Sequence, residues 1–338
     1  MNLPQPSRLQ FTADLNICRI LNGMWQVSGA HGSIDPERAV ESMFEYVDAG
    51  FTTFDLADHY GPAEDFIGEF RRRLEQSRGK DALSHLQAFT KWVPMPSAMT
   101  RAVVEAAIDR SLRRMNVGAL DLLQFHWWDY GDDRYLDALK HMADLQKEGK
   151  IRHLGLTNFD TDHLAAVIDS GIRIVSNQVQ YSLIDRRPQL RMAQLCREHG
   201  VWLLAYGTVC GGLLTDRFLG ASEPIRAQLD TASLQKYKRM VDAWSGWESF
   251  QNLLVALGEI ASKHSVSIAN VATRYVLDQP AVAGVIVGVR LGRSAHIDDN
   301  ARAFRFTLDA DDLDRIEKAL AGSRDLFALI GDCGDEYR

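Results

Sequence analysis

The sequence is poor in cysteine and lacks the residue spacings of metal sites. Its 338 residues include four cysteines, none of them at C-x-x-C spacing. We therefore expect no disulfide framework, and reduced thiols in a cytoplasmic protein fit this pattern better. An H-E-x-x-H motif is also missing, and His59 has no carboxylate or histidine at ligand spacing. No metal site is predicted.

Long apolar runs and clusters of positive charge are missing as well. No run approaches the roughly 18 apolar residues that suggest a membrane-spanning helix, and residues 1–6 lack the basic and apolar regions of a signal peptide. The formal net charge is −7. This mildly acidic balance disfavours a nucleic-acid-binding surface, which needs clustered Lys and Arg. We expect neither a membrane nor a nucleic-acid partner, and these features leave the oligomeric state open.

What the chain does contain is a regular alternation of short apolar runs and longer helical patterns. The first helical pattern covers 35–50, where Asp35 and Pro36 form a typical start and Gly50 a typical end. The apolar runs have the character of strands and lie near 19–23, 53–55, 87–91, 121–125, 153–157, 174–178, 202–206 and 284–288.

The fold class that this alternation predicts is α/β, a (β/α)8 TIM barrel in a single domain over residues 1–338. An open dinucleotide-binding sheet is less favoured, because no G-x-G-x-x-G follows the first strand. A long irregular insertion, roughly Phe218–Gly246, follows the seventh strand and is expected to lie over the barrel. An amphipathic helix at Asp311–Leu320 is expected to cap the barrel, and Arg71–Arg73 to form a solvated helix face.

Polar residues stand at the ends of successive predicted strands, where the active sites of such barrels lie. Asp55 ends the second strand and is followed by Tyr60, Lys91 ends the third and His126 the fourth. A lysine cation near the phenol would lower the pKa of Tyr60, which is ordinarily about 10. The tyrosine could then protonate a carbonyl oxygen as hydride reaches the carbon. Each residue alone has a structural explanation, and their joint occurrence favours chemistry.

Several motifs together make the chain resemble the aldo-keto reductase superfamily over nearly its whole length. D-L-A-D-H-Y-G at Asp55–Gly61 resembles the family's D-x-A-x-x-Y-G signature. Lys91 and His126 fall where the other two catalytic residues of the family belong. G-L-T-N-F at Gly155–Phe159 is similar to G-x-S-N-F, and Asn177–Tyr181 is similar to N-Q-x-x-Y.

The resemblance implies a role for each candidate catalytic residue. Tyr60 would be the general acid or base, Lys91 and Asp55 would tune it, and His126 would orient the carbonyl. The implied activity interconverts an aldehyde, ketone or sugar carbonyl and its alcohol. The implied cofactor is NADP(H), with NAD(H) less favoured.

The resemblance also implies which residues hold that cofactor. Tyr206 would stack on the nicotinamide, and the loop after it would follow the pyrophosphate, although it departs from the family pattern at three positions that include Cys210. Arg290 and Arg293 are the candidates for a ribose 2′-phosphate, with two solvated arginines as the alternative. The full implied set is Gly23, Met24, Thr157, Asn158, Gln178, Tyr206, Gly207, Thr208, Val209, Gly211, Gly288, Val289, Arg290, Arg293, Asp299 and Asn300.

Tryptophans follow several of the same strand ends. Aromatic walls near a reacting carbonyl commonly shape a substrate pocket. We expect Trp25, Trp92 and one of the pair Trp127 and Trp128, with Trp127 preferred, to contact the substrate. For each of them, packing between barrel and helices is the structural alternative.

Two other functions share the same barrel. A cofactor-binding regulatory subunit, similar to potassium-channel β subunits, would retain the same four candidate catalytic residues and act through a partner. An aldolase-type enzyme would use Lys91 as a Schiff-base nucleophile. The second of these gives Tyr206 and the segment 288–300 no role, so it ranks below the others.

Overall fold

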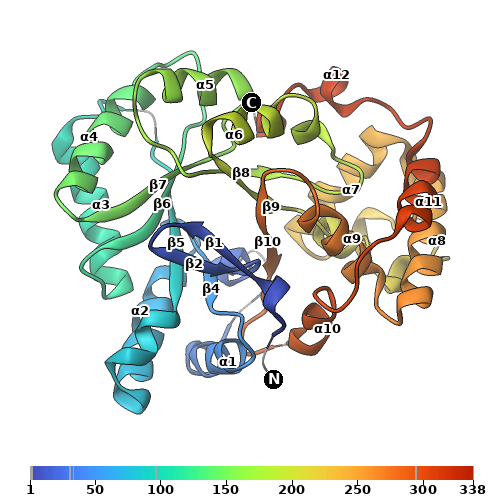
Figure 1. Ribbon diagram of the computed structural model, residues 1–338, viewed down its shortest axis with the longest axis horizontal. Helices are drawn as coiled ribbons and strands as arrows, with labels where there is room; N and C mark the ends of the chain where they lie inside the picture. Colours follow the sequence, from blue (N-terminus) through green and yellow to red (C-terminus); the bar gives the residue numbers. More distant parts are fainter. Residues whose placement is uncertain (1–2, 30–31, 33, 96, 294, 338) are drawn as a thin grey trace.

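Eight parallel strands form a closed barrel at the centre of the molecule (Figure 1). The structure is a computed structural model that describes residues 3–29, 32, 34–95, 97–293 and 295–337. The barrel closes in the order β10-β3-β4-β5-β6-β7-β8-β9. This architecture confirms the predicted (β/α)8 barrel. The strands are β3 (Ile20–Gly23), β4 (Thr53–Asp55), β5 (Gln87–Trp92), β6 (Leu120–His126), β7 (Ile151–Thr157), β8 (Ser176–Gln180), β9 (Trp202–Tyr206) and β10 (Val282–Gly288).

Helices surround the barrel and bury their apolar faces against it. Local signals set their ends: the Asp35 side chain accepts a hydrogen bond from the Arg38 N–H at the start of the first helix, and Gly200 ends the sixth with a left-handed φ of 65°. The helices are α1 (Pro36–Asp48), α2 (Ala63–Arg78), α3 (Arg101–Met115), α4 (Tyr135–Lys147), α5 (Thr161–Asp169), α6 (Met192–His199), α7 (Ala232–Trp244), α8 (Gly246–His264), α9 (Ile268–Leu277), α10 (Ile297–Arg302), α11 (Ala310–Leu320) and α12 (Leu326–Ile330).

An antiparallel hairpin that the sequence did not reveal closes the amino-terminal end of the barrel. It consists of β1 (Arg8–Thr12) and β2 (Leu15–Cys18). Its buried side chains pack with residues from the barrel interior into one apolar cluster: Phe11, Leu15, Ile17, Leu21, Phe89, Leu122, Val175, Leu204 and Ala283. Because this cluster fills the lower barrel, the space for polar chemistry lies at the carboxyl ends of the strands.

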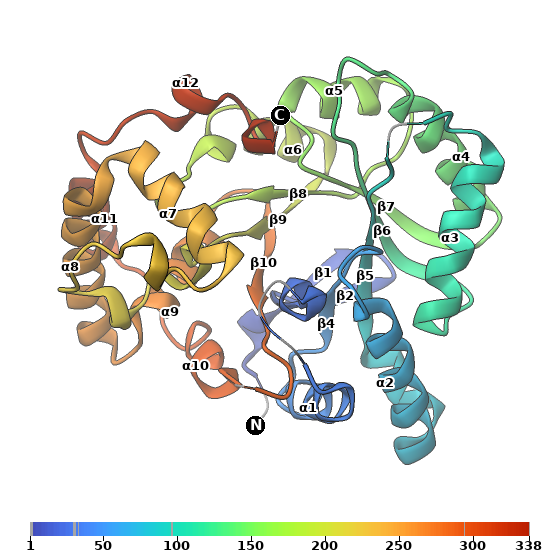
Figure 2. The ribbon, with the colours of Figure 1, turned by 180° about the vertical axis from the view of Figure 1, so that it is seen from behind.

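The insertion after β9 is present, but it is not irregular. Its second half folds as α7, whose Leu234, Tyr237 and Val241 are buried. The helix packs against the short turn Cys210–Gly212 that follows β9. α11 packs against α8 on the outside of the barrel (Figure 2). The expectation of an irregular segment was therefore wrong for residues 232–244, because their apolar spacing supports a helix, and this helix covers the loop after β9.

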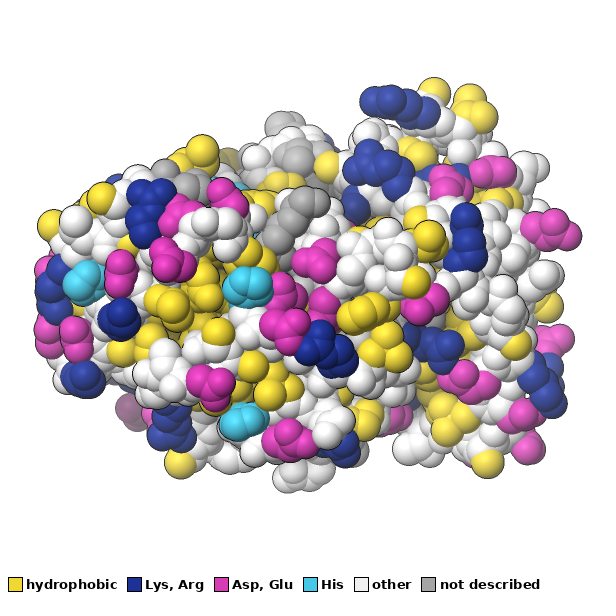
Figure 3. All heavy atoms as spheres, turned by 90° about the horizontal axis from the view of Figure 1, so that it is seen from above, with side chains coloured by type: hydrophobic (Ala, Val, Ile, Leu, Met, Phe, Trp, Pro, Cys, Tyr) yellow, Lys and Arg dark blue, Asp and Glu magenta, His cyan; other side chains and the backbone are white. Residues whose placement is uncertain are grey.

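No helix of the described ranges is both long and apolar enough to cross a bilayer. On the face shown in Figure 3, basic and acidic side chains are interspersed. All four cysteines are buried free thiols.

Candidate active site

A buried salt bridge lies at the carboxyl ends of two neighbouring strands. Lys91 Nζ, from β5, lies 2.5 Å from Asp55 Oδ2, at the end of β4. The same ammonium donates to the Leu56 carbonyl at 2.8 Å. Both charged side chains are almost completely shielded from solvent. Burial lowers the pKa of Lys91, and the nearby Asp55 carboxylate opposes that effect.

Two glutamine amides complete the partners of the aspartate. Asp55 Oδ1 accepts hydrogen bonds from Gln124 Nε2 at 2.9 Å and from Gln178 Nε2 at 2.8 Å. Gln178 also donates to Gln124 Oε1 at 2.7 Å. Gln124 did not stand out in the sequence, although a glutamine in the apolar β6 strand was the available signal. The Gln178 amide nitrogen already donates to Asp55 and Gln124, so Gln178 can offer a ligand only its carbonyl oxygen.

Tyr60 lies beside this salt bridge, with its ring centroid 5.0 Å from Lys91 Nζ. Trp25 meets it edge-on at 5.0 Å between ring centroids. Burial raises the pKa of Tyr60 well above its ordinary value, and the Asp55 carboxylate adds to this rise. The expectation of a lowered pKa is therefore wrong, because burial of the phenol and the neighbouring Asp55 charge both raise it. Burial therefore favours the protonated phenol over the phenolate.

His126 ends β6 and is buried within the same mouth. Its ring lies 4.2 Å from that of Trp128, which is partly exposed. Trp127 is completely buried, and its indole N–H donates to the carbonyls of Asp129 and Asp132. Its burial argues against Trp127 as a substrate contact and favours Trp128, which lies beside His126.

The predicted nicotinamide contacts lie together at the ends of β7 to β9. Thr157 Oγ1 is buried without a hydrogen-bond partner in the described part of the chain. Asn158 has a left-handed φ of 57°, and its Oδ1 accepts a hydrogen bond from the Tyr206 hydroxyl at 2.8 Å. The buried hydroxyl of Thr157, which has no partner among the described residues, is a place where an amide group of a ligand would fit.

The loop after β9 is covered by α7. A side-chain carbon placed on Gly207 would lie 2.3 Å from the Tyr237 hydroxyl, and one on Gly211 would lie 2.8 Å from the Tyr237 ring. Both glycines also have left-handed φ angles, of 74° and 63°. Thr208 Oγ1 is buried and has no hydrogen-bond partner among the described residues. Gly207 and Gly211 therefore leave room for Tyr237 of α7 and also allow the left-handed backbone of the loop.

The predicted adenosine contacts follow β10 and are mixed in exposure. Arg290 and Arg293 are exposed, whereas Val289 is buried. Asp299 uses both carboxylate oxygens within the protein, accepting from the Ser267 hydroxyl and the Asn270 amide at 3.0 Å each. The other predicted cofactor contacts lie on several elements. Gly23, at the carboxyl end of β3, abuts Ile286, and Gly288, at the end of β10, abuts Gln26. Met24 is buried, whereas Val209 and Asn300 are partly buried.

The last residues of the described chain return to the mouth, which the sequence did not predict. Glu336 Oε1 accepts from the Tyr206 hydroxyl at 3.0 Å, and its Oε2 lies 2.8 Å from Arg187 Nη2. Arg187 is itself buried and paired with Asp185 at 2.8 Å. Burial alone would raise the pKa of Glu336, but the charges of Arg187 and Lys236, together with hydrogen bonds to the carboxylate, outweigh burial and lower that pKa. The carboxylate is thus a strong anchor for the segment.

Tyr337 is the aromatic part of this returning segment. Its ring centroid lies 4.3 Å from Lys236 Nζ of α7 and 6.3 Å from the ring of His126. It also lies 5.8 Å from the ring of Trp128. The segment therefore joins α7, β6 and β9 across the mouth. Nothing in its short, mixed sequence distinguishes it from an ordinary exposed terminus.

The pH dependence of stability tests the Glu336 anchor. Because its folded pKa is lowered, Glu336 contributes stability that is present above the unfolded pKa of about 4.3 and is lost as pH falls through the folded pKa. Glu336→Gln is expected to destabilise the protein at pH 7, and the difference from wild type should shrink in acid. Urea unfolding across this range measures it. A difference that stays constant with pH would contradict the anchor.

Comparison with known proteins decides the family. The model of the aldo/keto reductase family matches residues 19–321. The chain belongs to the aldo/keto reductase family. It is thus an oxidoreductase of the kind that acts on carbonyls and alcohols. The match spans every barrel strand from the end of the amino-terminal hairpin to α11.

Individual relatives are distant. The chain is 27% identical to an uncharacterised oxidoreductase, YqkF, of Bacillus subtilis, over 82% of this chain and 84% of that protein. It is 26% identical to the chloroplastic pyridoxal reductase of Arabidopsis thaliana, over 86% and 78%. It is 28% identical to flagellar radial spoke protein 5 of Chlamydomonas reinhardtii, over 71% of this chain, but spans only 56% of that protein.

Solved structures show the same fold. A glycerol dehydrogenase from Gluconobacter oxydans superposes with a TM-score of 0.78 at 22% identity, covering 94% of this chain and 96% of that one. An aldo/keto reductase from Klebsiella pneumoniae, solved with NADP and acetate, gives 0.70 at 22% identity, with 92% and 94% covered. Identities this low support the barrel and leave the roles of residues to the chemistry of the site.

Proposed function

We propose that this chain, as one barrel domain over residues 1–338, reduces a small carbonyl compound with NADPH, or oxidises the alcohol with NADP⁺. The observation that carries the proposal is the buried Lys91–Asp55 salt bridge next to Tyr60. A buried ion pair is expensive to keep, because desolvation offsets much of its attraction. The position of the ion pair beside the partly buried Tyr60 phenol supports a chemical role for it.

Tyr60 is the proposed proton donor. Its raised pKa keeps the phenol protonated at neutral pH, so that the proton is present when negative charge develops on a carbonyl oxygen. Lys91, held by Asp55 and Leu56, places a fixed positive charge near the phenolate that is left after transfer. His126, on the next strand, is proposed to orient the carbonyl oxygen toward Tyr60.

The proposed cofactor site runs from the ends of β7 and β8 across β9 and β10. When bound, the nicotinamide would supply or accept the hydride at the carbonyl carbon. The unsatisfied hydroxyls of Thr157 and Thr208 and the carbonyl oxygen of Gln178 would hold its polar groups. Tyr206 would support the ring from one side. Relatives solved with NADP and NADPH support this choice of cofactor.

The proposed substrate pocket is walled by aromatic side chains. Trp25 and Trp128 flank Tyr60 and His126, and Tyr337 closes the opposite side. Trp92 is mostly buried against Phe125 and contributes to the floor. Walls of this kind favour a flat or apolar carbonyl compound over a heavily hydrated one.

A substrate screen that follows NADPH absorbance tests the proposal. Relatives carry names that describe reduction of pyridoxal, glyoxal and L-glyceraldehyde 3-phosphate, so small aldehydes lead the panel, followed by ketones and sugars. Oxidation of NADPH that depends on both protein and carbonyl is expected. No turnover with any member, together with no NADPH binding, would contradict the function.

The preference for NADPH over NADH tests the two arginines after β10. Arg290→Gln with Arg293→Gln is expected to weaken NADPH binding by about tenfold or more, because each guanidinium can make charge-assisted hydrogen bonds to a phosphate. NADH binding should change little. Arg302→Gln, an exposed arginine on the neighbouring α10, is the matched control. Equal losses for both cofactors would assign the arginines no part in reading the 2′-phosphate. Fluorescence titration measures both affinities.

A further inference from the structure

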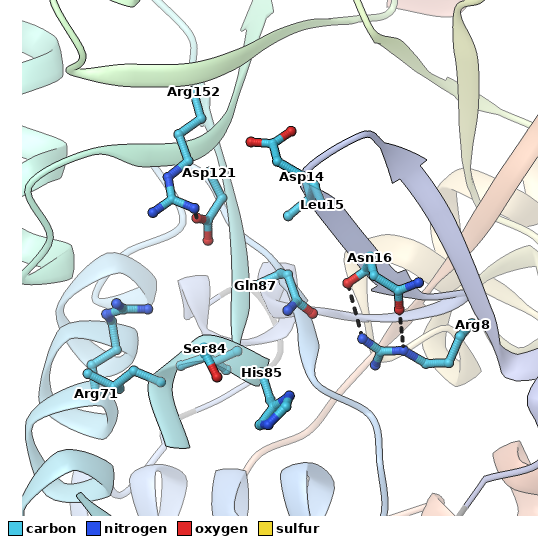
Figure 4. A pocket seen from close by; sticks show the side chains of 12 residues that line it. Arg8, Asp14, Leu15, Asn16, Arg71, Ser84, His85, Gln87, Asp121 and Arg152 are labelled. Atoms are coloured by element: carbon cyan, nitrogen blue, oxygen red, sulfur yellow. Dashed lines mark hydrogen bonds and ion pairs between the residues drawn. The ribbon is translucent and has the colours of Figure 1, made fainter. Parts of the chain in front are cut away.

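A polar cavity of about 310 Å³ lies at the amino-terminal end of the barrel, away from the proposed active site. The hairpin β1–β2 forms one wall, and α2 with the turn after it forms another. The starts of β5, β6 and β7 contribute Gln87, Asp121 and Arg152 (Figure 4). The cavity therefore lies outside the apolar cluster that fills the barrel.

Three guanidinium groups line this cavity, and two of them form no salt bridge. Arg152 lies 3.7 Å from Asp121. Arg8 donates to neutral groups only, namely the side chain and carbonyl of Asn16 and the Thr52 hydroxyl. Among the residues that the structure describes, no carboxylate lies within salt-bridge distance of Arg8 or Arg71. The cavity thus carries an excess of positive charge.

Arg71 is the most unusual of the three. The sequence predicted a solvated face for Arg71–Arg73, and the next two arginines do pair with Glu69 on that face. Arg71 instead turns inward: its Nε is buried and has no hydrogen-bond partner among the residues that the structure describes. Burial lowers its pKa. An inward arginine with an unsatisfied donor is costly unless an acceptor completes it.

The other polar lining groups include one further donor and two carboxylates that already have partners. Gln87 Oε1 accepts from the Thr52 and Thr53 hydroxyls, which leaves its amide nitrogen as a donor. The Asp121 carboxylate accepts from the Ala88 N–H. The second carboxylate of the lining, Asp14, lies 2.9 Å from His153 Nε2 at the rim. The lining thus holds three arginines and one free amide donor against two carboxylates, each of which already has a partner.

We propose that this cavity binds a small phosphorylated metabolite through its phosphate group. In Figure 4, Arg71 and Arg8 lie on opposite sides of the cavity, with Gln87 between them. A tetrahedral anion with several acceptor oxygens can receive donors from different directions, as guanidinium groups and an amide would provide here. The volume is at the lower end of the range for small-molecule sites, which limits the occupant to a compact one. The proposal does not depend on the proposed oxidoreductase function.

Calorimetric titration with inorganic phosphate at constant ionic strength tests whether the cavity binds a phosphate group. Acetate is the second probe. Phosphate is expected to bind wild type and to bind Arg71→Gln about tenfold more weakly or worse. Arg72→Gln, the adjacent arginine outside the lining, is the matched control and should keep wild-type binding. Arg152→Gln, which is more exposed, provides a second lining variant if Arg71→Gln does not fold.

The remaining outcomes overturn the proposal. Equal phosphate binding in wild type and both lining variants, or none in wild type, removes the site. Loss of binding in Arg293→Gln but not in the lining variants would place the phosphate after β10, in the proposed cofactor site. Acetate bound as tightly as phosphate would show a carboxylate site instead. None of these results depends on turnover, so failure here is distinct from failure of the proposed activity.

Discussion

Tyr60→Phe is expected to lower kcat/KM for carbonyl reduction by about 10²–10⁴-fold, the usual contribution of a general acid. The substitution removes one hydroxyl and keeps the ring that packs edge-on against Trp25. Folding and NADPH affinity should therefore stay near wild type. Steady-state kinetics on the best substrate of the screen, with a parallel NADPH titration, measures both quantities.

His59→Phe is the control for this result. His59 precedes Tyr60, is exposed, and lies 4.8 Å from its ring. A histidine is a common general acid, yet His59 has no assigned role in the site. Its substitution should leave turnover within a few-fold of wild type. A large loss in His59→Phe together with an active Tyr60→Phe would reverse the assignment.

Lys91→Met is expected to have the largest effect on stability, about 3–5 kcal/mol, because it leaves the Asp55 carboxylate buried without its counter-ion. The amides of Gln124 and Gln178 still donate to Asp55, which keeps the loss toward the lower end. Activity should also fall, since the fixed charge beside Tyr60 is gone. Chemical denaturation measures the free energy of unfolding.

The double variant Asp55→Asn with Lys91→Met separates stability from activity. With both charges removed, most of the lost stability should return, because neither partner is left buried and unpaired. Activity should not return. A double variant as unstable as the sum of both single variants would show that the two groups do not act as a pair. Recovery of turnover would remove the lysine from the mechanism.

The barrel could be predicted because its signals are local. Each strand is a short apolar run, and each helix has a cap or an apolar face within a few residues. The hairpin β1–β2 escaped prediction because its Phe11 and Ile17 find their partners in the distant strands β5, β6 and β9. α7 escaped because charged and small residues around it obscured its apolar face.

Part of the site could also be predicted, because some of its signals are local in the sequence. Asp55, Lys91 and His126 end strands, and the rule that barrels use strand ends brings them together without any coordinates. Gln124 lies within β6, where only the direction of its side chain shows that it contacts Asp55. Glu336 and Tyr337 depend on a long return of the chain, anchored by Arg187. The raised pKa of Tyr60 depends on burial, which no motif records.

Single-turnover oxidation of NADPH tests the central claim most directly, with wild type and Tyr60→Phe each loaded with the cofactor and mixed with the best aldehyde of the screen. The account predicts that both proteins bind NADPH with similar affinity, that wild type oxidises it, and that Tyr60→Phe does so at least about a hundredfold more slowly. Oxidation at the same rate in both proteins, or an inability of wild type to bind NADPH, would contradict it.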